Sequence, residues 1–159
     1  MTAAEKTNAM RQLEASGIAF TPYYYNTADG AIDGLAVAQK IGQPVESVFK
    51  TLLTQTPEAE ICVFIIPVDS ELDLKKAARA AAVKSITMAP LKDIFKISGY
   101  LKGGCSPIGM KRLYRSFVAE EAILLNTMIC SAGKVGVQIE LAPDDLVQQI
   151  GASYADLLK

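Results

Sequence analysis

The chain has 159 residues, of which 50% are hydrophobic, and its formal net charge is -1. This length is enough to bury one hydrophobic core, so we expect a single domain over residues 1–159. The sequence contains no histidine, which excludes Ser-His-Asp and Cys-His catalysis and most transition-metal sites.

The N-terminal part of the chain predicts two helices and an edge strand. Residues 3–16 carry apolar side chains at helical spacing and stop at Gly17. Residues 18–25 are aromatic and β-branched, and Pro22 places this strand at a sheet edge. Residues 35–41 predict the second helix. The N-terminus lacks the apolar segment and cleavage site of a secretory signal, so we expect a cytoplasmic location.

Two apolar stretches in the middle of the chain predict a β-hairpin. Residues 48–54 and 61–68 have strand-like composition, and residues 56–60 separate them with turn-forming side chains. These runs are far shorter than the roughly 20 residues that span a bilayer. We therefore expect no transmembrane segment and no membrane partner.

The segment after the hairpin predicts two helices around a short strand. Residues 73–82 begin with an aspartate, consist of strong helix formers and carry a basic outer face. Residues 85–88 predict a short strand. Residues 90–98 open with a proline and stop at Gly99, which predicts another helix.

The C-terminal part predicts two strands followed by two helices. Residues 127–132 and 135–141 predict strands joined by a turn around residues 132–134. Residues 142–150 begin with proline and two acids and predict a helix, and we expect a last short helix at the end of the chain. Helices and strands interleave without strict alternation. We therefore predict an α+β fold with a mixed, curved or barrel-like β-sheet surrounded by helices.

Charge is distributed unevenly along the sequence. Residues 1–74 hold 4 basic and 10 acidic side chains, residues 75–115 hold 10 and 1, and residues 116–159 hold 2 and 6. The balances are therefore -6, +9 and -4. Two interpretations stay open: the basic segment binds a polyanion, or it forms the solvated face of one helix.

Residues 99–109, G-Y-L-K-G-G-C-S-P-I-G, form a loop with four glycines. Its backbone N–H groups can approach a ligand closely, as an oxyanion or a phosphate requires, although an ordinary tight turn has the same composition. Without a histidine to activate its thiol, Cys105 is not expected to be a nucleophile. The three cysteines lack paired spacing, so we expect no disulfide framework, no zinc site, and core positions for Cys62 and Cys130.

Lys50 is a lone charge in the apolar stretch V-F-K-T-L-L. A buried ammonium must find a partner, lose its proton or meet a bound anion. Val48 and Leu52 share its face of the strand, because side chains alternate at period two. That face is expected to be core or pocket, unless the lysine stem packs on apolar surface while its ammonium reaches water.

Four motifs follow one another along the chain: V-F-K-T-L at 48–52, the glycine loop at 99–109, S-A-G-K at 131–134 and I-E-L at 139–141. In this order they resemble the YbaK/EbsC family, the free-standing relatives of the editing domain inserted in bacterial prolyl-tRNA synthetases. The resemblance covers nearly the whole chain. It implies a mixed, barrel-like sheet wrapped by helices and hydrolysis of wrongly charged aminoacyl-tRNA, typically Cys-tRNA(Pro). It implies aminoacyl-tRNA and prolyl-tRNA synthetase as partners, and no metal or organic cofactor.

The resemblance also implies roles for individual residues. Lys50 matches the family's functional lysine and Gly103 the glycine of its G-x-x-x-P loop, so both are predicted to be catalytic. Many Cys-tRNA(Pro) deacylases read G-L-D-I-E-L where this chain reads G-V-Q-I-E-L, so Gln138 departs from the pattern. The predicted substrate-binding residues are Tyr25, Thr51, Gly104, Ser106, Pro107, Ser131 and Gln138.

Basic residues beside these motifs are predicted to contact tRNA phosphates without reading sequence. They are Lys102, Lys111, Arg112 and Lys134, with Arg115 close by. Two routes of attack remain without histidine: a water held by backbone and hydroxyl groups, or the substrate's own cysteine thiol. Removal of another small amino acid, such as alanine or serine, stays open, as does a catalytically silent tRNA-binding module.

Overall fold

A computed structural model of the protein describes residues 6–159. The helices are α1 (Asn8–Ala15), α2 (Gly34–Ile41), α3 (Leu74–Ala81), α4 (Ile94–Ser98) and α5 (Pro143–Ile150), with short 3₁₀ turns at η1 (Val45–Ser47), η2 (Leu91–Asp93) and η3 (Glu120–Leu124). The strands are β1 (Thr21–Tyr24), β2 (Phe49–Gln55), β3 (Ile61–Pro67), β4 (Thr87–Met88), β5 (Arg115–Ala119), β6 (Met128–Lys134), β7 (Val137–Leu141) and β8 (Ser153–Ala155).

Local signals at the helix ends explain why the predicted helices form. The side chains of Thr7, Asp33 and Asp73 accept hydrogen bonds from backbone N–H groups in the first turns of α1, α2 and α3. Gly42 ends α2 and Gly99 ends α4, each with a left-handed backbone conformation. The first predicted helix is confirmed for residues 8–15, and residues 3–5 of that prediction lie outside the described residues.

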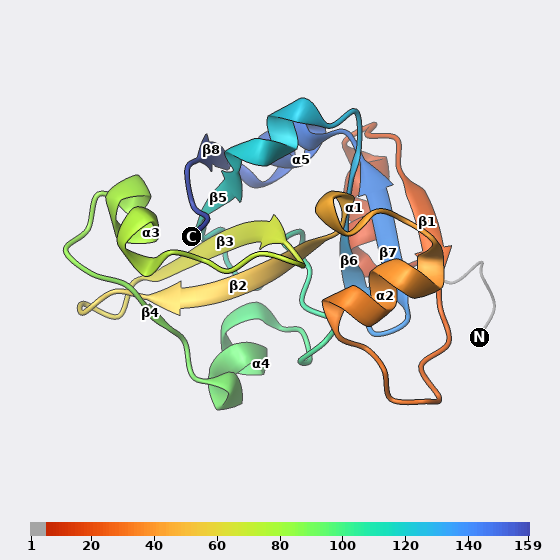
Figure 1. The fold of residues 1–159 in the computed structure, drawn as a ribbon, viewed down its shortest axis with the longest axis horizontal. Helices are drawn as coiled ribbons and strands as arrows, with labels where there is room; N and C mark the ends of the chain where they lie inside the picture. Colours follow the sequence, from red (N-terminus) through yellow and green to blue (C-terminus); the bar gives the residue numbers. More distant parts are fainter. Residues whose placement is uncertain (1–5) are drawn as a thin grey trace.

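The strands form two open sheets, which Figure 1 shows with the three-stranded sheet at the right and the five-stranded sheet extending to the left. The larger sheet has the order β4-β2-β3-β5-β8, with parallel pairs at β3–β5 and β5–β8 and antiparallel pairs elsewhere. The smaller sheet, β1-β7-β6, is antiparallel and places β1 at its edge. The predicted mixed α+β fold and the β2–β3 hairpin are confirmed. The strands do not close into one barrel.

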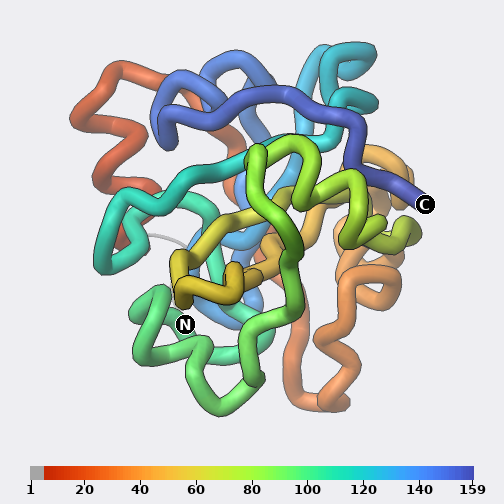
Figure 2. Tube along the Cα trace, turned by 90° about the vertical axis from the view of Figure 1, so that its left-hand side faces the viewer, coloured from red at the N-terminus to blue at the C-terminus, as the bar shows by residue number. Residues whose placement is uncertain are grey.

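Two predictions for the C-terminal part were wrong. Residues 153–155 form β8, not a helix, because they pair with the edge of β5, where Val118 lies opposite Tyr154. Figure 2 shows this last segment (dark blue) running alongside β5 (teal). The turn predicted around residues 132–134 lies further on, because β6 continues through an irregularity to Lys134 before the chain reverses. Strand β5 itself was not predicted.

The main core lies under both sheets and is built from aliphatic and aromatic side chains. Leu13 of α1, Ile139 of β7 and Leu146 of α5 are completely buried in it. Phe64 of β3 stacks on Phe117 of β5 with ring centroids 5.3 Å apart. No helix within residues 6–159 is long and apolar enough to cross a membrane.

The two sheets meet at the beginning of β2. Val48 forms an isolated parallel bridge with Ile129 of β6, and both side chains are buried. Ala38 of α2 and Val68 pack with them in a second, smaller hydrophobic cluster. This junction fixes the start of β2, including Lys50, against the three-stranded sheet.

Candidate active site

A cavity of about 550 Å³ opens where the two sheets meet. Its walls come from the loop before α2, the start of β2, the glycine loop, and the strands β6 and β7. The volume falls within the range of roughly 300–1,000 Å³ that is typical of small-molecule sites. Six predicted site residues line it: Lys50, Thr51, Lys102, Gly103, Ser131 and Gln138.

Lys50 projects into this cavity from β2 and is half-buried. Val48 lines the cavity beside it, whereas Leu52 packs against the main core, so the face predicted as core or pocket is partly each. Among residues 6–159, no side chain or carbonyl forms an ion pair or hydrogen bond with the Lys50 ammonium. The fold therefore presents an uncompensated positive charge to whatever enters the cavity.

Two buried hydroxyl oxygens, one of them at the cavity, have no hydrogen-bond partner within the described part of the chain. They are Oγ1 of Thr51, which lines the cavity, and Oη of Tyr25, which precedes the loop before α2. A buried polar atom without a partner costs about 1–3 kcal/mol. Such atoms are retained in native structures where a ligand or water satisfies them.

Gly103 and Gly104 bring the backbone of the glycine loop close to its neighbours. Gly103 has φ +86°, and a Cβ there would lie 3.0 Å from Cδ1 of Ile32. At Gly104, a Cβ would lie 3.0 Å from the backbone nitrogen of Val135. The Gly104 N–H donates to the carbonyl of Leu101 at 3.0 Å, whereas the Gly103 N–H bonds to no other described residue. Gly103 therefore supplies a free backbone donor beside the cavity.

Comparison with known proteins places this geometry in a family. The family described as the aminoacyl-tRNA editing domain matches residues 33–148, which is more than half of the chain. The chain belongs to the aminoacyl-tRNA editing domain family. It is also 39% identical over 153 residues, 96% of this chain and 93% of the relative, to an Enterococcus faecalis protein named "Putative Cys-tRNA(Pro)/Cys-tRNA(Cys) deacylase EbsC".

Solved structures show the same fold for this editing domain. A crystal structure of "a putative trans-editing enzyme for prolyl tRNA synthetase" superimposes with a TM-score of 0.83 at 20% identity, covering 98% of this chain and 99% of that one. The "hypothetical protein APE2540" superimposes with a TM-score of 0.85 at 19% identity, covering 94% of this chain and 97% of that one.

The far wall of the editing-domain cavity carries polar groups from β6 and β7. Ser131 and Gln138 lie opposite each other in the register, and the Gly133 N–H donates to the Ser131 hydroxyl at 3.1 Å. Gln138 is buried and places a neutral carboxamide at the cavity wall. Two ammonium groups, from Lys50 and Lys102, and one carboxylate, from Asp33, line the cavity, which therefore favours an anionic or electron-rich ligand.

Four residues predicted to bind substrate do not line the cavity: Tyr25, Gly104, Ser106 and Pro107. Ser106 is completely buried, and its hydroxyl accepts from the Ile108 N–H at 3.2 Å. Pro107 faces a separate cavity of about 120 Å³. Gly104, Ser106 and Pro107 are buried within the glycine loop, and contact of all four residues with substrate stays a prediction.

Cys105 lines the cavity and is partly buried. Burial raises the pKa of Cys105 to about 11, so its thiol is protonated at neutral pH. This agrees with the expectation that Cys105 is not a nucleophile. Cys62 and Cys130 are completely buried, as predicted.

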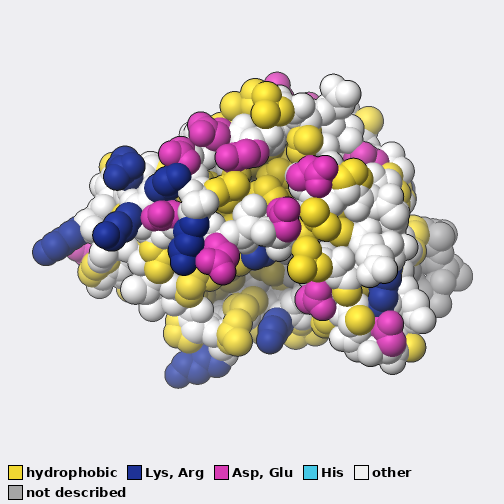
Figure 3. Space-filling model, in the orientation of Figure 1, with side chains coloured by type: hydrophobic (Ala, Val, Ile, Leu, Met, Phe, Trp, Pro, Cys, Tyr) yellow, Lys and Arg dark blue, Asp and Glu magenta, His cyan; other side chains and the backbone are white. Residues whose placement is uncertain are grey.

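The basic side chains predicted to contact phosphates are exposed on the surface. Figure 3 shows Lys and Arg gathered over α3 at the left and near α4 below, with acidic side chains across the middle and top. Lys102 lies at the cavity, and the Lys111 ammonium is 5.0 Å from the centroid of the Phe95 ring. Arg112 and Lys134 are also exposed.

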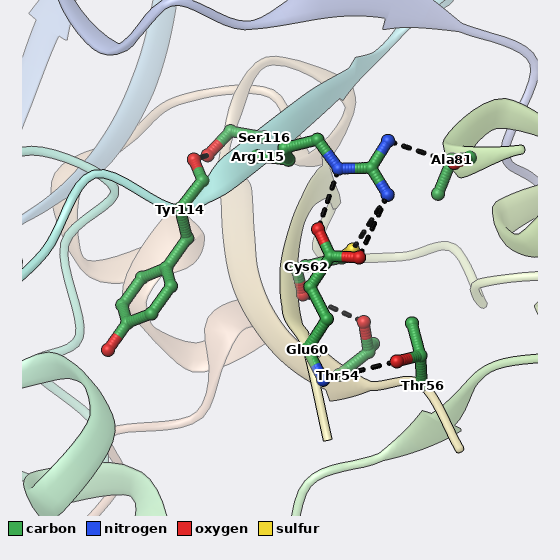
Figure 4. A network of polar contacts seen from close by, with 8 residues as sticks. All are labelled: Thr54, Thr56, Glu60, Cys62, Ala81, Tyr114, Arg115 and Ser116. Atoms are coloured by element: carbon green, nitrogen blue, oxygen red, sulfur yellow. Dashed lines mark hydrogen bonds and ion pairs between the residues drawn. The ribbon is translucent and has the colours of Figure 1, made fainter. Parts of the chain in front are cut away.

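Arg115 is instead occupied by contacts within the fold. Figure 4 shows its guanidinium paired with both carboxylate oxygens of Glu60, at 2.7 and 3.2 Å, and donating to the Ala81 carbonyl at 2.9 Å. These bonds tie the start of β5 to the β2–β3 hairpin and the end of α3. A phosphate contact by Arg115 would have to compete with this network.

The loop before α2 is the part of the site that sequence analysis missed. Gly30, Ile32 and Asp33 of this loop line the cavity, together with Gly34 at the start of α2 and Val68 after β3. The sequence A-D-G-A-I-D-G at 28–34 contains two Asp-Gly dipeptides, which are turn signals. They indicate a loop at this place but give no sign of its contact with Gly103.

Proposed function

We propose that this editing domain hydrolyses wrongly charged aminoacyl-tRNA in trans, as a single-domain aminoacyl-tRNA deacylase with Cys-tRNA(Pro) as its substrate. The observation that carries the proposal is that Lys50 and Gly103 line the same cavity, and that within residues 6–159 neither the Lys50 ammonium nor the Gly103 N–H has a hydrogen-bond partner. Membership in the editing family and the name of the Enterococcus relative support the same activity.

The chemistry requires stabilisation of negative charge more than proton abstraction. Hydrolysis of the ester between the amino acid and the terminal ribose passes through a tetrahedral oxyanion. One backbone donor aimed at that oxyanion is worth about 3–4 kcal/mol. Lys50 adds a cationic partner in the same cavity, and Thr51 lines it with a buried hydroxyl that has no hydrogen-bond partner among the described residues.

With cysteine as the amino acid, the nucleophile comes from the substrate. The thiol sulfur attacks its own carbonyl carbon, the bond to the ribose oxygen breaks, and the thiol proton ends on that oxygen. The products are tRNA with a free terminal hydroxyl and a cyclic thioester, which water then opens. Alanine and proline carry no thiol, so this route selects for cysteine without an enzymatic base.

Gln138 favours a second candidate substrate. Its carboxamide is neutral and both donates and accepts hydrogen bonds, so the cavity wall carries no negative charge at this position. Such a wall suits a hydroxyl as well as a thiol. Ser-tRNA is therefore the alternative that Gln138 favours, with attack by a bound water, and Ala-tRNA stays open as another small amino acid without support from this residue.

The tRNA body would bind beside the cavity through phosphate contacts. The residues proposed for these contacts are Lys102, Lys111, Arg112 and Lys134. They carry no base-reading arrangement, so we assign recognition of tRNA identity to a bound prolyl-tRNA synthetase, in the cytoplasm where tRNA is charged.

A deacylation panel tests the proposal. Purified protein is incubated with Cys-, Ala- and Ser-charged tRNA(Pro), with and without prolyl-tRNA synthetase, and loss of the ester is followed over time. We expect cleavage of Cys-tRNA(Pro), abolished by Lys50→Ala and retained by Lys84→Ala, a substitution at an exposed lysine that does not line the cavity. A wild-type chain that cleaves none of the three would indicate a tRNA-binding module instead.

A further inference from the structure

Residues 26–33, which we name the strap, form one wall of the cavity. Gly30, Ile32 and Asp33 line it. Ile32 also rests on the glycine loop, because its Cδ1 atom lies 3.0 Å from where a Cβ of Gly103 would be. The position of the strap therefore decides how much room is left beside Gly103.

The strap has local turns but few attachments. The side chains of Asn26 and Asp29 accept from the N–H groups of Ala28 and Ala31, at 2.9 and 3.0 Å. These bonds shape the strap without joining it to another element. Within the described chain, every hydrogen bond from residues 26–32 to the rest of the molecule comes from Lys40.

Lys40 lies in the last turn of α2, and its ammonium uses all three donors on the strap. It donates to the carbonyls of Asn26 and Ala31, at 2.7 and 2.9 Å, and to the Asp29 carboxylate at 2.7 Å. Two of the three acceptors are backbone oxygens, so the bonds fix the path of the main chain. The same contact keeps the pKa of Asp29 below its ordinary value.

We propose that Lys40 is a positioning residue for the deacylation: it holds the strap in place and thereby forms the binding site for the aminoacyl end of the substrate. This inference rests on the proposed function. Lys50 and Gly103 belong to β2 and the glycine loop, to which Lys40 donates none of its hydrogen bonds. Loss of Lys40 therefore weakens substrate binding through the strap, while Lys50 stays held on β2 by the Val48–Ile129 bridge.

Lys76 provides a matched control because it makes the same kind of clamp elsewhere. Its ammonium donates to the Asp156 carboxylate at 3.1 Å and to the Leu158 carbonyl at 2.7 Å, tying the end of the chain to α3. The two lysine side chains are similarly exposed, at 21% for Lys40 and 31% for Lys76. None of the residues in the Lys76 clamp lines the cavity.

The test compares steady-state deacylation by the wild type, Lys40→Met, Lys40→Arg and Lys76→Met. For Lys40→Met we expect KM to rise about tenfold or more while kcat stays within about threefold of wild type. Lys40→Arg restores part of the binding, since arginine donates to the same carboxylate and carbonyls. Lys76→Met lowers the melting temperature but keeps both kinetic constants.

Hydrogen exchange supplies a readout that does not depend on activity. Amides of residues 28–32 are expected to exchange faster in Lys40→Met and at the wild-type rate in Lys76→Met. If Lys40→Met does not fold, Asp29→Asn removes one charged acceptor and is expected to raise KM by a smaller factor.

The outcomes separate the two proposals. An active wild type with unchanged KM in Lys40→Met, or equal kinetic changes in both methionine variants, overturns the role of Lys40 alone. A wild type inert on the whole panel overturns the proposed function and this inference with it.

Discussion

Replacing Gly103 by alanine tests whether the backbone of the glycine loop takes part in the reaction. The residue has φ +86°, so alanine is forced into a left-handed conformation. The new methyl group would also stand 3.0 Å from Cδ1 of Ile32 and 3.5 Å from Cγ2 of Val135. Both neighbours are ends of side chains, so they yield by a small shift. The main cost is therefore backbone strain and displacement of the Gly103 N–H.

The expected magnitudes differ for stability and for catalysis. The left-handed conformation costs an alanine about 1–2 kcal/mol. For a domain of this size that lowers the melting temperature by about 2–8 °C. If the Gly103 N–H stabilises the oxyanion, its displacement lowers kcat by about 10²–10³-fold. Catalysis is then lost far beyond what the modest loss of stability explains.

Gly151→Ala separates these two effects. Gly151 ends α5 with φ +64°, has no atom within 4 Å of its Cβ position, and does not line the cavity. Both variants are compared with wild type by thermal unfolding and by single-turnover deacylation of Cys-tRNA(Pro). If both variants lose a similar amount of melting temperature and Gly103→Ala still deacylates at the wild-type rate, the oxyanion role of this N–H is refuted.

The remaining predictions concern a thiol, an ion pair and the phosphate contacts. Because the Cys105 pKa is about 11, iodoacetamide should modify it slowly at pH 8, and Cys105→Ala should keep full deacylation; loss of activity in that variant would contradict this. The hydrogen bond from Arg115 lowers the pKa of Glu60. The ion pair therefore stabilises the fold fully at any pH above the ordinary glutamate pKa, and this stabilisation is lost as the pH falls through the lowered pKa of Glu60. The melting temperatures of wild type and Glu60→Gln should therefore differ at pH 7 and converge in acid, and a constant difference would rule the pair out. tRNA binding should weaken steeply with salt, and Lys102→Ala or Lys111→Ala should each reduce the salt slope by about 1, whereas a flat salt response removes this surface from the site.

The features predicted correctly from sequence depend on local signals. Capping by Asp73 and the stop at Gly42 set helix ends through neighbours a few residues away. β5 was not predicted, and β8 was mistaken for a helix. Both strands form parallel pairs with strands that are far away in the sequence. Such strands are short and lack the alternation that marks an antiparallel edge.

The candidate site divides in the same way. Lys50 and Gly103 stand out because a lone charge in an apolar strand and a glycine-rich loop are visible in the residues themselves. The strap does not, since its role comes from Ile32 reaching the glycine loop and from Lys40 holding it there. Ser106 and Pro107 have the right motif, yet the loop turns them into the interior.

The reacting groups and the strap belong to separate stretches of chain with separate anchors. β2 carries Lys50 and is held by the Val48–Ile129 bridge, while the strap depends on Lys40. Evolution can therefore lengthen, shorten or rewrite the strap without disturbing the ammonium. Under the proposed role of Lys40, this separation makes residues 26–33 the segment to exchange when the amino-acid preference of the enzyme is to be changed.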